Sequence, residues 1–247
     1  MKRYKCIVSY DGTYFHGYQI QPNERTVQGE IQRAIDKMHK KEMPLIVASG
    51  RTDQGVHALG QVFHFDSPLQ LTCERWQKAL NALTPDDLYI HHVEHVSNDF
   101  HARFDARKKT YEYRIMQAYP DVFRRCYAYY FPYELDVAVM RKAANLLEGT
   151  HDFSAFCASG TSVKDKVRTI DTIEIIKERD ELIFTFTGNG FLYNMVRILV
   201  GTLLEIGTKK RKIATIEEAF ITQDRSLTGI TAPSHGLYLK EVFYSDK

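Results

Sequence analysis

The sequence predicts an α+β protein in which two ferredoxin-like halves (βαββαβ) share a mostly antiparallel sheet flanked by helices. Segments in which apolar residues alternate, as in strands, are interleaved with segments in which they recur every three or four positions, as in helices. The order strand, helix, strand, strand, helix, strand occurs twice along the chain. The 247 residues are 44% hydrophobic and 26% charged, which describes a soluble globular chain with an ample core.

The first half begins with a strand over residues 3–10 that ends in a turn at residues 11–13. Thr26 can cap the following helix, whose apolar stripe begins at Val27 and whose final lysines suit the helix dipole. The later elements of this half are predicted as strands at 44–48, 61–65 and 88–96 and a helix that runs from Cys73 to the stop signal Thr84-Pro85.

The second half opens with a strand over residues 110–117, and Asp136 starts a helix that ends before Gly149. The remaining elements are predicted as a hairpin of strands 167–176 and 182–186, a helix from Phe191 to Glu205 and a closing strand at 236–244. A basic connector, residues 101–109, separates the halves. We place the boundary there, which gives an N-terminal half of residues 1–105 and a C-terminal half of residues 106–247, with a ligand cleft between them.

A carboxylate in a glycine-flanked loop, Asp53, is the main candidate for chemistry. The predicted strands on either side place it at a strand-to-strand turn, and Gly50 and Gly55 permit backbone angles that are closed to other residues. Arg51 and His57 add charged or polar partners. A structural turn in which Asp53 caps local amides is the alternative, and it is the commoner meaning of an Asp in such a loop.

Several classes of protein are disfavoured by composition. No apolar run is long enough to span a bilayer, and the first residues enter a strand pattern directly, so we expect a cytoplasmic protein without a membrane segment. The four cysteines are far apart and form no Cys-x-x-Cys pair, so neither a zinc ribbon nor a disulfide framework is expected. The histidines lack ligand spacing, and no metal is expected.

The net charge of +2 is too small to imply a polyanionic partner, but the basic residues are clustered. They lie in the connector, in a loop near residue 165 and at 209–212, after the last long helix. Such clusters can follow a phosphate backbone, and tyrosines beside them can stack on unpaired bases. Solvated loop charge is the alternative for each cluster, and the adjacent Asp105 and Asp165 favour it.

Longer motifs then carry a resemblance that covers nearly the whole chain. They are Tyr10-Asp11-Gly12-Thr13-Tyr14-Phe15-His16-Gly17-Tyr18-Gln19, Gly50-Arg51-Thr52-Asp53-Gln54-Gly55-Val56-His57-Ala58, His101-Ala102-Arg103-Phe104, Lys109-Thr110-Tyr111-Glu112-Tyr113, the stretch 149–156, and Asn194-Met195-Val196-Arg197 followed by Val200-Gly201. With these motifs the chain resembles the tRNA pseudouridine synthases of the TruA type.

The resemblance implies an isomerase that converts uridine to pseudouridine in the anticodon stem-loop of tRNA, at positions 38, 39 and 40, without cofactor or metal. It also implies a homodimer with tRNA contacting both subunits. No nucleotide-cofactor fingerprint is present, because Gly188-Asn189-Gly190 lacks the required spacing.

The family match also assigns roles to residues. Asp53 is expected as the catalytic carboxylate, acting by attack on the sugar or base or by removing a sugar proton. Arg197 is expected to form an ion pair with it and keep it ionised, with an exposed helix charge or a structural ion pair as the alternatives. Tyr111 is expected to stack on the uracil, with a core strand tyrosine as the alternative.

Further roles rest on the same resemblance. Arg51 is a candidate for flipping the target nucleotide or for holding a phosphate. Leu237 is expected to line the uracil pocket, although a buried strand leucine predicts the same burial. The basic clusters, and not the resemblance, supply the candidates for binding the RNA backbone, which are Arg103, Arg107, Lys108, Lys109, Lys164 and Arg168. The rival classes are a catalytically silent RNA-binding protein on tandem ferredoxin-like units and a metal-dependent hydrolase, for which the needed ligand cluster is not found in the sequence.

Overall fold

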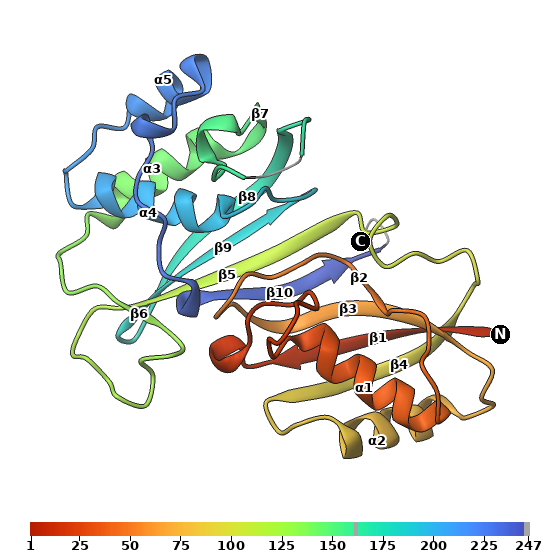
Figure 1. Cartoon of the computed structure of the whole chain (residues 1–247). Coiled ribbons are helices and arrows are strands. Elements are labelled where there is room, and N and C mark those ends of the chain that lie inside the picture. The colour runs from red at the N-terminus through yellow and green to blue at the C-terminus, as the bar shows by residue number, and fades with distance from the viewer. Residues whose placement is uncertain (161–162, 245–247) are drawn as a thin grey trace. The chain divides into compact units, whose positions relative to one another are not determined.

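The computed structural model describes residues 1–160 and 163–244, and the chain divides into two compact units (Figure 1). Unit 1 consists of Met1–Arg107 with Tyr238–Lys247, and unit 2 consists of Lys108–Leu237. Residues 161–162 and 245–247, which the predicted C-terminal half includes, lie outside the described residues. Each unit contains a sheet of mainly antiparallel strands with helices packed against it, so the predicted α+β class is confirmed.

The sheet of unit 1 has the strand order β4-β1-β3-β10. Its strands are β1 (Lys2–Tyr10), β3 (His57–Ser67), β4 (Leu88–Val96) and β10 (Leu237–Phe243), and the short β2 (Val47–Ala48) also pairs with β3. β1 runs antiparallel to both β3 and β4. Because β1 occupies one edge of β3, β2 and β10 share the other edge: β2 pairs at His64 and Phe63, and the parallel β10 pairs at His57 and Ala58.

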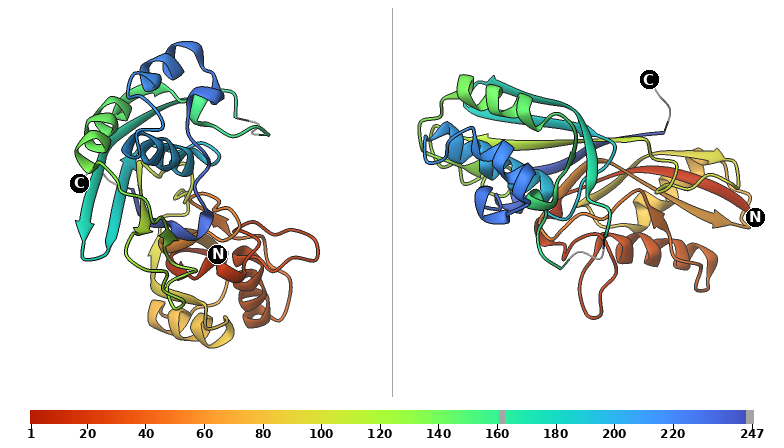
Figure 2. Two further views of the ribbon diagram at one scale, coloured as in Figure 1. Left: turned by 90° about the vertical axis from the view of Figure 1, so that its left-hand side faces the viewer. Right: turned by 90° about the horizontal axis from the view of Figure 1, so that it is seen from above.

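Two helices, α1 (Val27–His39) and α2 (Cys73–Leu83), lie side by side against this sheet (Figure 2). Thr26 caps α1 by accepting from the amide of Gly29, as predicted. In the core between the helices and the sheet, the fully buried ring of Trp76 on α2 contacts Tyr4 and Phe65 on the strands.

The sheet of unit 2 has the strand order β5-β9-β8-β7 with antiparallel neighbours. Its strands are β5 (Lys108–Met116), β7 (Gly149–Asp152), β8 (Val167–Glu178) and β9 (Glu181–Gly188), and β6 (Tyr129–Tyr130) pairs parallel with β5. The predicted hairpin is therefore confirmed. Its two-residue connection turns at Arg179, which has a φ of 54°.

The helices of unit 2 are α3 (Val137–Leu147), α4 (Met195–Gly207) and α5 (Thr215–Thr222). Asp136 starts α3, as predicted, and does so as the N-cap, accepting from the amide of Val139. The prediction that α4 begins at Phe191 is wrong: Asn194 has a φ of 59°, which is left-handed, so regular helix begins only at Met195. Within residues 1–160 and 163–244, no helix is long and apolar enough to cross a membrane.

Candidate active site

Asp53 lies in a tight turn between β2 and β3 of unit 1. The amide of Val56 donates to the carbonyl oxygen of Asp53 at 3.1 Å, and Gly55, the third residue of the turn, has a φ of 76°. A positive φ at that position is typical of a type II turn and favours glycine. Asp53 is half-buried, whereas Arg51 is exposed.

A second loop, residues 11–18 after β1, supports this turn through two glycines. A Cβ atom on Gly12 would lie 2.1 Å from the carbonyl oxygen of Val56, and one on Gly17 would lie 2.9 Å from that of Thr52. The amide of Tyr18 donates to the same oxygen of Thr52 at 3.0 Å. Side chains at both glycine positions would push the two loops apart, so the absence of Cβ atoms lets backbone support the residues on each side of Asp53.

A buried side-chain hydrogen bond fixes Thr52, the residue before Asp53. The hydroxyl groups of Tyr10, at the end of β1, and Thr52 lie 2.8 Å apart. Burial raises the pKa of Tyr10 to about 12, so its phenol stays protonated at neutral pH and keeps its hydrogen-bonding capacity.

Gln61 on β3 holds the segment that leads into the turn. Its Oε1 accepts from the hydroxyl of Ser49 at 2.7 Å, and its Nε2 donates to the carbonyl oxygen of Gly50 at 3.0 Å. Gln61 is fully buried, so these bonds are shielded from water. The side-chain amide of Gln61 thus holds Ser49 and Gly50, the residues that connect β2 to the Asp53 turn.

His57, the first residue of β3, is buried next to the turn. Its Nδ1 accepts from the amide of Gly12 at 3.0 Å and lies 3.2 Å from Oδ1 of Asp11. Its ring stacks on Tyr238 of β10 with centroids 4.7 Å apart. The sequence pointed to His57 as a partner near Asp53, but it gave no sign that the contact passes through the loop after β1.

In unit 2, Arg197 lies in the first turn of α4 and is half-buried. Its Nε donates to the carbonyl oxygen of Ala232 at 2.6 Å, and its Nη1 donates to Oδ1 of Asn194 at 2.7 Å. The amide of Ala232 in turn donates to the carbonyl oxygen of Arg197 at 3.1 Å. The orientation of the guanidinium is therefore set by backbone and amide groups of its own unit.

Ala232 belongs to a segment, residues 225–236, that packs closely on α4. A Cβ atom on Gly201 would lie 1.8 Å from the carbonyl oxygen of Ile230, and one on Gly229 would lie 2.4 Å from the amide nitrogen of Thr202. The hydroxyl of Thr202 accepts from the amide of Gly229 at 2.8 Å. The glycine of the Val200-Gly201 motif thus has a structural reason, since a side chain at this position would prevent the segment from packing so closely on α4.

Charged side chains, two from outside the segment and Arg225 within it, also hold it in place. Glu205 accepts from the amide of Ile230 at 3.0 Å and from Nε of Arg211 at 2.9 Å. Arg211 and Arg225 donate to carbonyl oxygens between residues 227 and 229. Arg211 lies in the basic cluster 209–212, and its guanidinium has this structural role.

Tyr111 lies on β5 and is half-buried, with its ring edge-to-face against Phe191 at 5.1 Å. Two residues further along the strand, the hydroxyl of Tyr113 donates to the carbonyl oxygen of Pro233 at 2.8 Å. A Cβ atom on Gly236 would lie 2.8 Å from the Tyr113 ring. The segment that orients Arg197 therefore also contacts β5, and it leads to Leu237, which is 6% exposed.

The candidate site residues are divided between the units: Arg51 and Asp53 belong to unit 1, and Tyr111, Arg197 and Leu237 belong to unit 2. The predicted pairing of Asp53 with Arg197 stays a prediction. The sequence missed Tyr10, the supporting glycines and Ala232. The only sequence signal for the first two was their presence in the motif at 10–19, and nothing in the sequence marked Ala232.

The predicted RNA-binding residues also fall in both units. Arg103 and Arg107 in unit 1 are exposed, as are Lys108 and Lys164 in unit 2. Lys108 forms an ion pair with Asp171 at 3.2 Å, and Arg168 donates to the carbonyl oxygen of Val167 at 2.6 Å. Lys109 is half-buried. Their role toward RNA stays a prediction.

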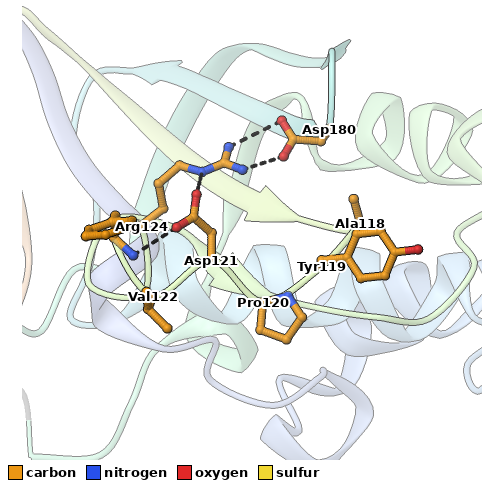
Figure 3. Close-up of a pocket in the computed structure, with 8 residues that line it drawn as sticks. Ala118, Tyr119, Pro120, Asp121, Val122, Arg124 and Asp180 are labelled. Carbon is orange, nitrogen blue, oxygen red and sulfur yellow. Dashed lines mark hydrogen bonds and ion pairs between the residues drawn. The ribbon is translucent and has the colours of Figure 1, made fainter.

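A cavity of about 380 Å³ lies in unit 2, and none of the candidate residues lines it. It is lined by residues 118–124 of the loop between β5 and β6 and by Asp180 of the β8–β9 turn (Figure 3). Arg124 joins these two segments by bonding to Asp121, Asp180 and Glu181. Across residues 1–160 and 163–244, no cluster of three or more His, Cys, Asp or Glu side chains is arranged to hold a metal ion.

The chain matches known proteins in sequence over most of its length. The family model described as tRNA pseudouridine synthase matches residues 6–105 and 143–245. The chain therefore belongs to the tRNA pseudouridine synthase family, and the predicted assignment to an isomerase family is confirmed.

Individual relatives match along their full length. The chain is 54% identical over 246 residues to tRNA pseudouridine synthase A of Geobacillus sp. (strain WCH70), covering 99% of each protein. It is 54% identical over 247 residues to tRNA pseudouridine synthase A 1 of Bacillus cereus (strain ATCC 14579), covering 100% of each.

A chain in a solved structure described as a Cbf5-Nop10-Gar1 complex gives a TM-score of 0.34 at 13% identity. The match covers 81% of this chain and 54% of that chain, so this chain spans about half of its length.

Proposed function

We propose that this protein isomerises uridine to pseudouridine in the anticodon stem-loop of tRNA, at positions 38, 39 and 40, with Asp53 as the catalytic carboxylate. The family match supports the reaction. The observation that carries the residue assignment is the turn that presents Asp53, which is held by backbone contacts from the 11–18 loop and by the Tyr10–Thr52 hydrogen bond. A preorganised carboxylate of this kind suits catalysis better than a mobile loop residue does.

The reaction needs no net redox change and no second substrate. The bond between N1 of uracil and the anomeric carbon breaks, the base turns, and C5 bonds to the same carbon. The proton on C5 is lost and N1 gains one, so the atoms balance. Asp53 acts by attack on the sugar or base or by removing a sugar proton, and each of these roles requires its ionised form.

Arg197 is the proposed partner that keeps Asp53 ionised. A cation favours the charged form of a nearby carboxylate, and the effect grows where water is excluded. The contacts of Arg197 with Ala232 and Asn194 support this role, because they fix the guanidinium before substrate binds. A fixed donor loses little conformational freedom when it acts on a reacting group.

Three further residues are proposed to bind the uracil base or to extrude its nucleotide from the stem. The half-buried ring of Tyr111 stacks on the uracil and limits its escape while it turns. Leu237 lines the uracil pocket. The exposed Arg51 assists extrusion of the target nucleotide, since chemistry on a base within a stem requires that it leave the stack.

The proposed setting is the cytoplasm, with tRNA bound across a homodimer. Arg103, Arg107, Lys108, Lys109, Lys164 and Arg168 are the proposed contacts to the RNA backbone. The exposure of Arg103, Arg107, Lys108 and Lys164 supports this assignment. Neutralising any of them should weaken binding in a salt-dependent manner.

The test uses unmodified tRNA labelled with tritium at C5 of uridine, because pseudouridine formation releases that hydrogen. Asp53→Asn should abolish release while tRNA binding and the melting temperature stay near wild type. Asp86→Asn makes the same chemical change at an exposed residue of unit 1 and should keep full activity. Release by Asp53→Asn would remove Asp53 from its role, and tRNA binding without release by the wild type would favour a silent RNA-binding protein.

A further inference from the structure

We infer that His57 is a positioning residue for the Asp53 turn and acts through the backbone of Gly12. This inference rests on the proposed function, because it takes Asp53 as the catalytic carboxylate. The ring of His57 is 2% exposed, so it lies too deep to reach a substrate itself. Its effect on the reaction must pass through the groups that it contacts.

The first step is the protonation state of the ring. The amide of Gly12 donates to Nδ1 at 3.0 Å, which requires that Nδ1 carry no proton. Asp11 Oδ1 lies 3.2 Å from the same nitrogen and would take a hydrogen bond only from a protonated Nδ1, so the two bonds exclude each other. Oδ1 of Asp11 already accepts from the amide and the hydroxyl of Thr13. The Gly12 amide is buried and needs the Nδ1 acceptor.

The second step links this bond to the turn. Gly12 packs so closely on the carbonyl group of Val56 that a Cβ atom there would lie at 2.1 Å. The amide of Val56 donates to the carbonyl oxygen of Asp53 and closes the turn. His57, Gly12, Val56 and Asp53 are therefore linked by a chain of contacts, in which the Nδ1 bond holds Gly12 against the turn.

The third step concerns the orientation of the His57 ring. The ring stacks on Tyr238 with an angle of 22° between the ring planes, and this contact restrains the plane of the imidazole and so the direction of Nδ1. Stacking and hydrogen bonding are separable by substitution. Phenylalanine at position 57 keeps a ring to stack on Tyr238 but provides no acceptor. Asparagine loses the ring but places Oδ1 at about the position of Nδ1.

The test compares His57→Phe with His57→Asn in the tritium-release assay. For His57→Phe we expect kcat to fall by about tenfold to hundredfold with KM for tRNA changed less than about threefold, because a displaced carboxylate affects the reacting geometry and not RNA binding. For His57→Asn we expect kcat within about threefold of wild type. A purely structural role would lower the melting temperature of both variants without this split in kcat.

Wild-type kcat in a folded His57→Phe protein would overturn the inference. If His57→Phe does not fold, His57→Asn decides alone, and a loss of kcat greater than about tenfold in the folded Asn variant would contradict positioning by the acceptor. Failure of the proposed function looks different: it appears as release by Asp53→Asn or as no release by the wild type. An active wild type, an inactive Asp53→Asn and an unaffected His57→Phe would reject this inference only.

Discussion

Arg197 and Ala232 bind each other twice: Nε of the arginine donates to the alanine carbonyl oxygen at 2.6 Å, and the alanine amide donates to the arginine carbonyl oxygen at 3.1 Å. This reciprocal contact fixes both ends of the Arg197 residue, its main chain and its guanidinium. The segment that carries Ala232 is itself fixed on α4 by Thr202 and Glu205. These contacts restrain the orientation of the side chain, which is the property that an electrostatic role in a reaction requires.

Arg197→Met should reduce turnover much more than tRNA affinity. The substitution keeps most of the apolar volume but removes the charge proposed to hold Asp53 ionised, and we expect a loss of about a hundredfold or more in kcat. Tritium release and equilibrium tRNA binding measure the two quantities. Lys142→Met, which removes a cation from the exposed side of α3, is the matched control and should change neither. A parallel fall in binding and turnover would contradict the ion-pair role.

Gly201→Ala should destabilise the protein by about 3 kcal/mol. The new Cβ atom would lie 1.8 Å from the carbonyl oxygen of Ile230, so the segment 225–236 must move away from α4. Urea unfolding gives the free energy of unfolding. Gly190→Ala is the control, because its Cβ atom would meet only the Arg168 side chain at 3.5 Å, an ordinary contact. Equal free energies of unfolding for the two variants would show that the segment 225–236 can move away from α4 at little cost.

Tyr10→Phe should cost about 1 kcal/mol at neutral pH through loss of the buried bond to Thr52. Burial raises the pKa of Tyr10 from 10.0 to about 12 in the folded protein. The folded state therefore holds this proton more tightly, and the related stability is complete below pH 10 and is lost as pH rises through 12. Wild type should lose roughly 2 kcal/mol more than Tyr10→Phe between pH 9 and 12, measured by urea unfolding. If the free energies of unfolding of the two proteins changed equally with pH, the ionisation responsible would belong to a group other than Tyr10.

His64 should make the protein sensitive to mild acid. Its Nδ1 accepts from the amide of Ala102 at 3.1 Å, and burial, with a smaller effect from Arg3, lowers its pKa from 6.5 to about 4. The unfolded chain takes up the proton first, so stability is lost as pH falls from 6.5 toward 4.

His64→Asn keeps an acceptor for Ala102 but does not titrate. Between pH 7 and 4 its free energy of unfolding should fall by roughly 2–3 kcal/mol less than that of wild type. Chemical denaturation at several pH values measures the difference. The same acid dependence in both proteins would exclude His64 as its source.

Periodicity predicted most of the fold because most elements bury one face. The strand predicted at 44–48 shows where this reasoning fails, since only Val47–Ala48 pairs as a strand. The backbone of Met43 and Ile46 bonds instead to the side chains of Gln28, Gln32 and Asp36 on α1. A short apolar segment can bond through its backbone to polar side chains spaced one turn apart on a neighbouring helix. Its sequence then looks the same as that of a strand.

The candidate site was predictable in part for a similar reason. The glycines around Asp53 indicated a turn, and Gly55 has the positive φ that only such a residue adopts readily. The support of the turn by Gly12 and Gly17 depends on residues about forty positions earlier in the chain, which no local pattern reveals. The segment 225–236 was missed because it has no periodicity and is held by carbonyl contacts to Arg211 and Arg225.

The place of β10 beside His57 and Ala58 affects how the protein is made. A ribosome releases β1, β3 and β4 early, but Tyr238 and Leu239, the partners of those two residues, emerge only after all of unit 2. Part of the β3 edge is therefore unpaired for most of translation, and unpaired edges invite wrong partners. Unit 2 is continuous in sequence and can fold as it emerges. The start of β3, which leads out of the Asp53 turn, is thus among the last parts of the nascent protein to gain a partner strand on its second edge.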